Sequence, residues 1–339
     1  MAERIAYEIA LTGAAIVDRS ARGKIVVSGN DRRSYLHAML TNDIAALTAG
    51  HGCYAAYLTP QGRLVADMRV LDLGDVVLLD VDRGVKDTLL EKLDQFIFSE
   101  DVRLGDVTDA FAGFGLCGPR SAEALAAALR AGGGSGPDAP ALTAFGEYSN
   151  TRIAFQGDVL IVAGSRELAG QAFDLYVDPQ RARVLLDALE RAGAGAIDEE
   201  TSEVLRVERG RPLFPRDMDG ETIPLEAGIE RRAISLTKGC YPGQEVITRI
   251  LHRGHGRVVR KLVGLLIAGA TRAAAGDLIR AGDREAGRVT SAVFSPALQR
   301  PIALGYVHRD FIAPGTAVEI IHGGGTLPAT VAELPFVGD

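Results

Sequence analysis

The chain carries the segment Lys238-Gly239-Cys240-Tyr241-Pro242-Gly243-Gln244-Glu245, and Arg249 follows close behind it. The two glycines of this segment permit backbone dihedrals that other residues avoid, and its proline fixes φ and removes a hydrogen-bond donor. We therefore expect the segment to hold Cys240 on a defined turn outside regular secondary structure. If Lys238 to Cys240 is extended, the two side chains share one face, and the ammonium group favours the thiolate form of the cysteine.

Apolar spacing before this segment predicts a mixture of strands and helices. We expect strands at residues 24–28, 64–70, 76–81, 110–116, 152–155, 159–162 and 173–177. We expect helices after Asp31 and at residues 85–96, 121–130, 180–192 and 199–209. Ser121 and Asp198 are candidate helix N-caps, and Gly210 can end a helix in a left-handed conformation. The composition of residues 131–140 predicts a flexible surface loop.

The pattern changes after Lys261. Short apolar segments alternate with glycine, aspartate and proline turns, without a helix pattern between them, at residues 262–267, 285–293, 302–307, 317–321 and 326–334. This alternation is typical of a small antiparallel barrel or sandwich. We therefore expect two regions, a larger α/β region at residues 1–254 and a β domain at residues 255–339.

Composition argues against several classes of protein. The chain has 339 residues, of which 47% are hydrophobic and 24% are charged, as in ordinary globular proteins. The formal net charge of −7 argues against general coating of nucleic acid, so we expect no stable nucleic-acid complex. The longest strongly apolar run, Leu262 to Ala270, is far shorter than the ~20 residues of a membrane helix, and residues 1–10 lack a secretory pattern. The 3 cysteines are widely spaced and suit a reducing compartment, so we expect a cytoplasmic protein without a membrane partner.

Several segments, in this order, resemble the YgfZ-type folate-binding proteins, which are relatives of the glycine-cleavage T-protein, an aminomethyltransferase. These segments are residues 27–31, 41–43, 62–67, 205–210, 217–219, 224–228 and the motif at 238–245 with Arg249. The mitochondrial iron–sulfur assembly factor of the same group shares the signature K-G-C-[YF]-x-G-Q-E. The resemblance covers most of the chain, and the cysteine motif is its most specific part.

The resemblance implies an α+β fold like that of the T-protein. Two intertwined α/β lobes of the ferredoxin-like type and a C-terminal antiparallel β-barrel would surround a central folate cleft. It also implies that tetrahydrofolate, or a derivative, is the cofactor. The implied role is support of iron–sulfur cluster assembly or repair, with iron–sulfur proteins or assembly factors as partners.

One departure from the T-protein pattern concerns Asp67. Working aminomethyltransferases carry a segment of the kind G-G-x-x-D-D, whereas this chain reads Gly62-Arg63-Leu64-Val65-Ala66-Asp67. Of the two aspartates in the T-protein segment, this chain has only Asp67. The chain also has the K-G-C motif that T-proteins lack. Both differences argue against ordinary aminomethyl transfer, although an Ala-Asp pair also occurs in folate-linked demethylating relatives.

Four carboxylates are candidate folate contacts, because a pterin ring offers adjacent N–H donors that a carboxylate accepts in bidentate fashion. They are Asp67, Asp174, Glu208 and Glu226. The resemblance puts Asp67 at the family's site aspartate and Asp174 where T-proteins place a pterin-binding glutamate. The alternative for each acid is a cap, a turn or a surface charge. Tyr176 is either a stacking partner for the ring or a core residue.

Cys240 is the candidate reactive group, as a thiolate that attacks an electrophile, exchanges disulfides or transiently binds iron. Lys238 is either its electrostatic partner or a solvated surface charge. Arg249 follows the motif and is the basic residue that we expect at the site. Cys53 and Cys117 have no charged neighbour in sequence and are expected to be structural.

The resemblance and these residues leave three functions open. The first is a tetrahydrofolate-binding protein that supports iron–sulfur cluster assembly through Cys240. The second is a folate-dependent aminomethyltransferase or methyltransferase that acts on a small amine donor, with Asp67 as the acid, base or electrostatic group. The third is an interaction scaffold with a vestigial folate pocket. We expect no resident metal, because His252 and His255 lack a second pair of ligands at metal spacing.

Overall fold

The computed structural model describes residues 2–133, 136–168 and 170–338. The chain divides into two compact units. Unit 1 comprises Met1–Tyr57, Val65–Thr201 and Arg232–Pro242, and unit 2 comprises Leu58–Leu64, Ser202–Arg231 and Gly243–Asp339. The predicted boundary near residue 255 stays a prediction, and the first strand of the C-terminal domain begins at Arg260.

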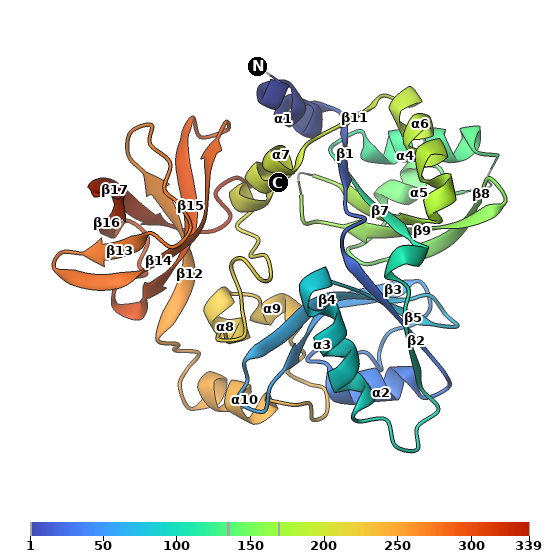
Figure 1. Ribbon diagram of the computed structural model, residues 1–339, viewed down its shortest axis with the longest axis horizontal. Helices are drawn as coiled ribbons and strands as arrows, with labels where there is room; N and C mark the ends of the chain where they lie inside the picture. Colours follow the sequence, from blue (N-terminus) through green and yellow to red (C-terminus); the bar gives the residue numbers. More distant parts are fainter. Residues whose placement is uncertain (1, 134–135, 169, 339) are drawn as a thin grey trace. The chain divides into compact units, whose positions relative to one another are not determined.

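Unit 1 contains a six-stranded sheet in the order β11-β1-β7-β10-β9-β8 (Figure 1). Its strands are β1 (Ala14–Asp18), β7 (Ala112–Cys117), β8 (Asn150–Phe155), β9 (Asp158–Ser165), β10 (Ala172–Val177) and β11 (Ala194–Ala196). The helices near it are α1 (Ala2–Thr12), α4 (Ser121–Ala131), α5 (Ala139–Thr143) and α6 (Ala182–Arg191), the last preceded by η2 (Pro179–Arg181). β1 pairs in parallel with β11, whereas β1 with β7, β7 with β10, β10 with β9 and β9 with β8 pair in antiparallel fashion. Leu125 and Leu129 of α4 and Leu189 of α6 pack into a core with the inner face of this sheet.

A five-stranded sheet in the order β3-β4-β5-β2-β6 follows in the chain. Its strands are β2 (Gly23–Ser28), β3 (His51–Leu58), β4 (Leu64–Asp72), β5 (Val77–Val81) and β6 (Arg103–Asp106). The helices α2 (Arg32–Met39) and α3 (Arg83–Asp94) belong to this part of the chain, and η1 (Thr108–Ala110) follows it. Leu36 and Leu40 around the end of α2, and Leu89 and Leu93 of α3, pack into one core with the sheet.

The chain crosses between these two sheets twice. It enters the six-stranded sheet at β1, builds the five-stranded sheet from β2 to β6, and returns through β7 to β11. The six-stranded sheet is therefore built from two separate stretches of chain, and the five-stranded sheet is a continuous stretch inserted between them. The prediction of intertwined α/β lobes is confirmed.

Unit 2 contains a closed six-stranded barrel in the order β12-β15-β14-β13-β16-β17, drawn in orange to red in Figure 1. Its strands are β12 (Arg260–Ile267), β13 (Leu278–Ala281), β14 (Arg284–Ser295), β15 (Arg300–His308), β16 (Ala317–His322) and β17 (Gly325–Ala332), with η3 (Arg309–Phe311) after β15. The other helices along the chain are α7 (Glu199–Glu208), α8 (Pro224–Ala227), α9 (Glu230–Ala233) and α10 (Gln244–His252). The predicted C-terminal antiparallel barrel is confirmed, although β13 was not expected.

Most local predictions agree with the observed elements, with a few corrections. Asp198 accepts a hydrogen bond from the Thr201 amide, and Gly210 has φ 61°, as predicted. Ser121 is not the N-cap of α4, because Arg120 occupies that position and the Ser121 hydroxyl donates to the Gln171 carbonyl. The expected loop at residues 131–140 includes the start of α5, and residues 134–135 lie outside the described residues.

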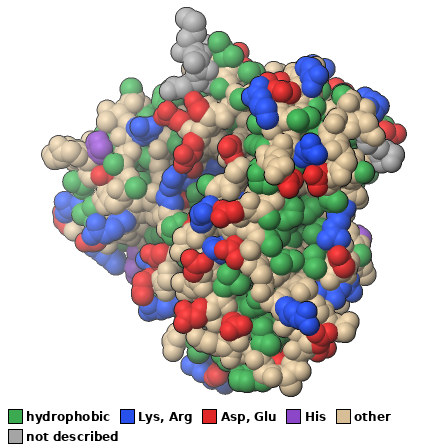
Figure 2. Space-filling model, turned by 45° about the vertical axis from the view of Figure 1, so that its right-hand side comes forward, with side chains coloured by type: hydrophobic (Ala, Val, Ile, Leu, Met, Phe, Trp, Pro, Cys, Tyr) green, Lys and Arg blue, Asp and Glu red, His purple; other side chains and the backbone are tan. Residues whose placement is uncertain are grey.

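Surface charge is mixed on the face that Figure 2 shows, where acidic and basic side chains are intermingled beside a strip of hydrophobic side chains. Every helix among the described residues is too short or too polar to cross a bilayer.

The barrel depends on the close approach of two strands at Gly287. A Cβ atom added to Gly287 of β14 would lie 1.7 Å from the Tyr306 carbonyl oxygen of β15. That oxygen belongs to the backbone of a paired strand, so it cannot move aside without separating the strands.

We predict that Gly287→Ala lowers the free energy of unfolding by about 3 kcal/mol, because the added methyl group forces β14 and β15 apart. Urea unfolding of the full chain would measure the effect. Gly325→Ala on β17 is the matched control, because its Cβ would lie 3.6 Å from the His322 carbonyl oxygen, an ordinary contact. Equal effects of the two substitutions would contradict this account of the barrel.

Candidate functional site

Asp67 and Tyr54 form a polar pair on neighbouring strands of unit 1. The Tyr54 hydroxyl on β3 donates to Oδ2 of Asp67 on β4 over 2.6 Å. Burial raises the pKa of Asp67, and the Tyr54 hydrogen bond and Arg22 oppose that shift. The structure shows no hydrogen bond to the other oxygen, Oδ1, from any residue that it describes. One acceptor of this carboxylate is therefore open to a ligand.

Arg232 is a second polar group at this pair, and the sequence analysis missed it. Its guanidinium carbon lies 4.8 Å from the centre of the Tyr54 ring, and Nη2 donates to Glu147 and to the Tyr148 hydroxyl, each over 2.9 Å. Its Nε is buried and has no partner among the described residues. The Arg231–Arg232 pair in the segment before Lys238 was the available signal, and nothing in it revealed that Tyr54 was near.

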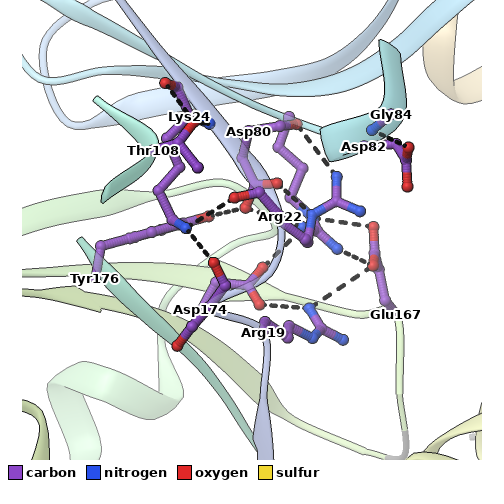
Figure 3. Close-up of polar contacts among 12 residues, drawn as sticks. Arg19, Arg22, Lys24, Asp80, Asp82, Gly84, Thr108, Glu167, Asp174 and Tyr176 are labelled. Atoms are coloured by element: carbon purple, nitrogen blue, oxygen red, sulfur yellow. Dashed lines mark hydrogen bonds and ion pairs between the residues drawn. The ribbon is translucent and has the colours of Figure 1, made fainter. Parts of the chain in front are cut away.

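Asp174 lies on β10 and is 3% exposed, so its burial rules out a surface charge. Its Oδ1 accepts from Nη1 of Arg19 over 2.5 Å, and its Oδ2 lies 3.5 Å from Nε of Arg69. Tyr176, two residues along the same strand, is 2% exposed and donates to Oδ2 of Asp80 over 2.7 Å. Figure 3 shows Asp174, Tyr176 and Asp80 within one group of contacts. Both residues therefore have partners inside unit 1, and their contact with folate stays a prediction.

The partners of Asp174 and Tyr176 form a buried network of ion pairs. Arg69 on β4 is 4% exposed and donates to Asp80 on β5 over 3.1 Å and to Glu167 in the loop after β9. Arg22 also pairs with Asp80 (Figure 3). These cations hold the pKa values of Asp80 and Glu167 below their usual range despite burial. The network joins residues of both sheets of unit 1.

The other predicted folate contacts lie in unit 2 and also have protein partners. Buried Glu208 accepts from the Ser295 hydroxyl of the barrel. Glu226, which is 8% exposed, lies 3.3 Å from Nε of Arg260. Arg249 on α10 forms an exposed i,i+4 pair with Glu245 over 2.9 Å. A role for these three residues at a site stays a prediction.

Cys240 lies on an irregular segment, as expected, and it is exposed. Lys238 is 8% exposed, so it is not a solvated surface charge. Its ammonium group donates to the carbonyls of His37 and of Leu40, the latter over 2.5 Å, and lies 4.9 Å from the centre of the Tyr241 ring. Burial lowers the pKa of Lys238 to about 8, opposed by Asp43 and the two nearby cysteines, Cys53 and Cys240.

Cys53 lacks the uncharged surroundings that the sequence predicted for it. The sequence shows no charged neighbour, but the fold brings Asp43 and Lys238 close enough to act on its thiol. Burial, reinforced by Asp43, raises the pKa of Cys53 to about 12. Cys53 is therefore held as the neutral thiol, whereas Cys117 is fully buried, as a structural cysteine would be.

Unit 2 also has a pocket of about 470 Å³, lined by residues 216–219 and Thr222 and by parts of β12, β14 and β15. Arg260 stacks on the Tyr306 ring there at 4.7 Å and pairs with Glu226. Asp217 accepts from Arg206, Thr290 and Ser291, so its charge is already satisfied. Among residues 2–133, 136–168 and 170–338, no group of three or more His, Cys, Asp or Glu side chains is arranged to hold a metal ion.

Comparisons with known proteins agree with this architecture. The model of the GCVT N-terminal domain matches residues 5–238, and that of the glycine cleavage T-protein C-terminal barrel domain matches residues 260–338. The chain is 30% identical over 330 residues to the aminomethyltransferase of Rubrobacter xylanophilus, covering 97% of this chain and 85% of the relative. It is 30% identical over 344 residues to the aminomethyltransferase of Streptomyces coelicolor, covering 98% of this chain and 89% of the relative.

The fold is also that of a solved T-protein. The crystal structure of the glycine cleavage system aminomethyltransferase T from Bartonella henselae matches with a TM-score of 0.87 at 22% identity, over 99% of this chain and 89% of that chain. This likeness confirms the expected T-protein-like fold. The matches support the wider T-protein group, and they do not single out its YgfZ-type members.

We predict that Arg69→Met lowers the free energy of unfolding by about 3–5 kcal/mol at pH 7, because it leaves buried carboxylates without their shared cation. Asp80 and Glu167 have depressed pKa values in the folded protein, so their contribution is full above the unfolded pKa of about 4 and is lost as pH falls through the folded values. In the variant these carboxylates bind protons more readily, which relieves the buried charge. The difference in free energy of unfolding between wild type and variant should therefore become smaller below about pH 4.

Urea unfolding at several pH values would measure the difference in free energy of unfolding between wild type and Arg69→Met. Arg83→Met removes an arginine from an exposed pair with Asp109 and should change stability by less than about 0.5 kcal/mol. A pH-independent difference between wild type and Arg69→Met would contradict the assigned role of the network.

Proposed function

The chain belongs to the glycine cleavage T-protein family, and from that premise we propose that it binds tetrahydrofolate and transfers a one-carbon unit from a small amine donor to it. The K-G-C motif favoured the iron–sulfur role, but three aminomethyltransferases match nearly the whole chain at 30% identity. We therefore propose transferase activity as the first function and iron–sulfur cluster assembly or repair as the second.

The observation that carries this proposal is the open oxygen of Asp67. A carboxylate that is largely desolvated and has one unused acceptor is suited to the paired N–H donors of a pterin or to a substrate amine. The Tyr54 hydroxyl donates a hydrogen bond of 2.6 Å to Oδ2 of Asp67, and this bond keeps Oδ1 in a defined position. The raised pKa of Asp67 brings it closer to the range in which a carboxyl group exchanges protons during catalysis.

Arg232, which lies over the Tyr54 ring, supports the same proposal. Its buried Nε lacks a partner among the residues described, and an unsatisfied buried donor costs about 1–3 kcal/mol. A ligand oxygen that accepted from Nε would recover this energy. Asp67 at the Tyr54 hydroxyl and Arg232 over the Tyr54 ring therefore offer an acceptor and a donor around one aromatic side chain, which suits a ligand that carries both N–H donors and acceptor atoms.

Tetrahydrofolate, when bound, would supply the amine that takes up the one-carbon unit. Asp67 would orient that ligand, stabilise positive charge on a nearby amine and accept its proton. Arg232 would hold an acceptor group of the ligand. Asp174 and Tyr176 would then act mainly through the network that fixes the surrounding strands, because their polar atoms are engaged with Arg19 and Asp80.

We predict that Asp67→Asn weakens binding of tetrahydrofolate at least tenfold and abolishes formation of methylenetetrahydrofolate from an amine donor. The substitution keeps the shape of the side chain but removes the negative charge and one acceptor. Because the folded state raises the pKa of Asp67, its ionised form destabilises the fold at neutral pH. The variant should therefore melt at the same temperature as the wild type or higher.

Calorimetric titration, an assay of methylenetetrahydrofolate formation and thermal unfolding would measure the three effects. Asp109→Asn, at a side chain that is 88% exposed, is the matched control and should change none of them. Wild-type affinity and turnover in Asp67→Asn would remove Asp67 from the function. Failure of the wild type to bind any folate would favour the scaffold instead.

The exposed Cys240 supports a second function, the support of iron–sulfur cluster assembly or repair. The buried ammonium group of Lys238 lies near this thiol and near Cys53, and both cysteines raise the pKa of Lys238. A thiol that is both exposed and near a cation is accessible to an iron or sulfur species carried by a partner protein. This function does not require turnover at Asp67.

We predict that Cys240→Ala abolishes this second function and leaves affinity for tetrahydrofolate within about twofold of the wild type, because the contacts of Asp67 and Arg232 do not involve the thiol. Activities of iron–sulfur enzymes in cells that express only the variant would measure the first effect, and calorimetry the second. Full complementation by the variant would exclude the thiol from the function.

A further inference from the structure

Arg232 is anchored at both ends of its side chain. At the backbone end, the side-chain amide of Asn42 donates to the Arg232 carbonyl over 3.0 Å and to the Tyr54 carbonyl over 2.8 Å. At the other end, Nη2 of the guanidinium group donates to Glu147 and to the Tyr148 hydroxyl, each over 2.9 Å. These contacts hold the guanidinium group in one position over the Tyr54 ring.

Tyr148 contributes to this anchor from a strained backbone. Its φ is 64°, in the left-handed region that a bulky residue rarely occupies. The Tyr148 amide donates to the Gly164 carbonyl over 2.8 Å, which ties the strained residue to β9. Two residues further on, the Asn150 amide donates to the Gly50 carbonyl over 2.7 Å. Strain of this kind persists where the surrounding structure enforces it, and it is frequent at ligand sites.

The fold also leaves room for the Tyr148 side chain beside Tyr54. Gly52 and Tyr54 are two residues apart on β3, so both positions lie on the same face of the strand. A Cβ atom added to Gly52 would lie 3.1 Å from Cβ of Tyr148 and 2.3 Å from the Val70 carbonyl oxygen. The absence of a side chain at Gly52 therefore lets Tyr148 pack against β3 and reach Arg232.

Tyr148 and Arg232 each keep a donor that no other described residue uses. The Tyr148 hydroxyl accepts from Nη2 of Arg232, so its own proton is left over, and the described residues include no acceptor for it. Burial raises the pKa of Tyr148, which keeps that proton on the oxygen. Nε of Arg232 is the second donor, buried and without a partner in the same part of the chain. The two side chains therefore offer neighbouring O–H and N–H groups to a ligand.

The surrounding charge favours a neutral acceptor for these donors. Burial alone would lower the pKa of Arg232, but Tyr148, Glu147 and Glu167 act in the opposite direction and raise it. A ligand carboxylate at Arg232 would lie close to Glu147, which already pairs with Nη2 at 2.9 Å, and like charges repel at that range. A carbonyl oxygen accepts from both donors without adding charge.

A pterin ring carries such an oxygen in the right place. Its 4-oxo group is next to the N–H donors that a carboxylate such as Asp67 accepts. Asp67 and Arg232 both contact Tyr54, one at its hydroxyl and the other at its ring. One pterin edge can therefore donate to Asp67 while the adjacent oxygen accepts from Arg232 and Tyr148.

We propose that Tyr148 and Arg232 form a donor pair that recognises the 4-oxo group of the pterin ring, and that Tyr148 also positions Arg232 for this contact. The inference rests on the proposed binding of tetrahydrofolate at Asp67. It adds the ring atom that the site recognises and a role for the strained backbone of Tyr148.

Folic acid and aminopterin test the donor pair, because aminopterin carries an amino group in place of the 4-oxo group and is otherwise identical. Calorimetric titration of the full chain gives the ratio of the Kd of aminopterin to the Kd of folic acid. We expect Tyr148→Phe and Arg232→Lys each to lower this ratio about fivefold, since each removes one hydrogen bond to the oxo group. Both variants keep the formal charge of the site, so a different attraction of the two rings to Asp67 cancels in the comparison.

The separate affinities distinguish recognition from a purely structural role. Tyr148→Phe should weaken binding of folic acid and leave the Kd of aminopterin within about twofold of wild type, whereas a distorted site would weaken both probes alike. Tyr35→Phe is the matched control, because it removes another buried tyrosine hydroxyl, which donates to the Leu93 carbonyl. It should leave the ratio unchanged. Thermal unfolding of the same samples would confirm that each variant is folded.

A wild-type ratio in folded Tyr148→Phe, or an equal loss of affinity for both probes, would overturn the inference. In either case, binding of folic acid by the wild type would leave the proposed folate function standing. A wild type that binds neither probe would overturn the folate function and the donor pair together.

Discussion

The shared cation of Arg69 is the constraint on which the architecture of unit 1 depends. Its guanidinium group contacts Asp80, Glu167 and Asp174, which come from three different parts of the chain. A buried arginine with several carboxylates is stable only when every partner is in place, because each unpaired charge costs several kcal/mol. The network therefore requires the two sheets to assemble in one register, which apolar packing alone does not impose.

That register positions the candidate site. Asp67 precedes Arg69 by two residues on β4, so the two side chains lie on the same face of the strand. Arg22 and Arg69 lower the pKa of Asp67, while its burial and Glu167 raise it. The ion network and the candidate folate carboxylate are therefore electrostatically coupled. A change in the network would alter the chemistry of Asp67 even without direct contact with a ligand.

Local pattern predicted much of the fold but little of the site. The Asp198 cap, the Gly210 helix end and the alternating strands of the barrel depend on residues close in sequence, and they were predicted correctly. Lys238, in contrast, bonds to carbonyls 201 and 198 residues away, and Arg232 contacts Tyr54 across a similar distance in the chain. Nothing in single-sequence periodicity encodes such pairings, so the sequence analysis missed Arg232. The site roles of Asp67 and Cys240 came from the resemblance to a family, and they stay predictions.

The order in which strands enter the two sheets has a consequence for synthesis on the ribosome. The strands of the five-stranded sheet, β2 to β6, lie between Gly23 and Asp106 and can pair as soon as that stretch has emerged. β1 is made earlier, but its neighbours β7 and β11 are translated later, the last of them ending at Ala196. At about 5–20 residues per second, this apolar strand waits on the order of ten seconds with both edges unpaired. Nascent chains of this protein are therefore exposed to a specific hazard of intermolecular strand pairing, which a chaperone that shields residues 14–18 would relieve.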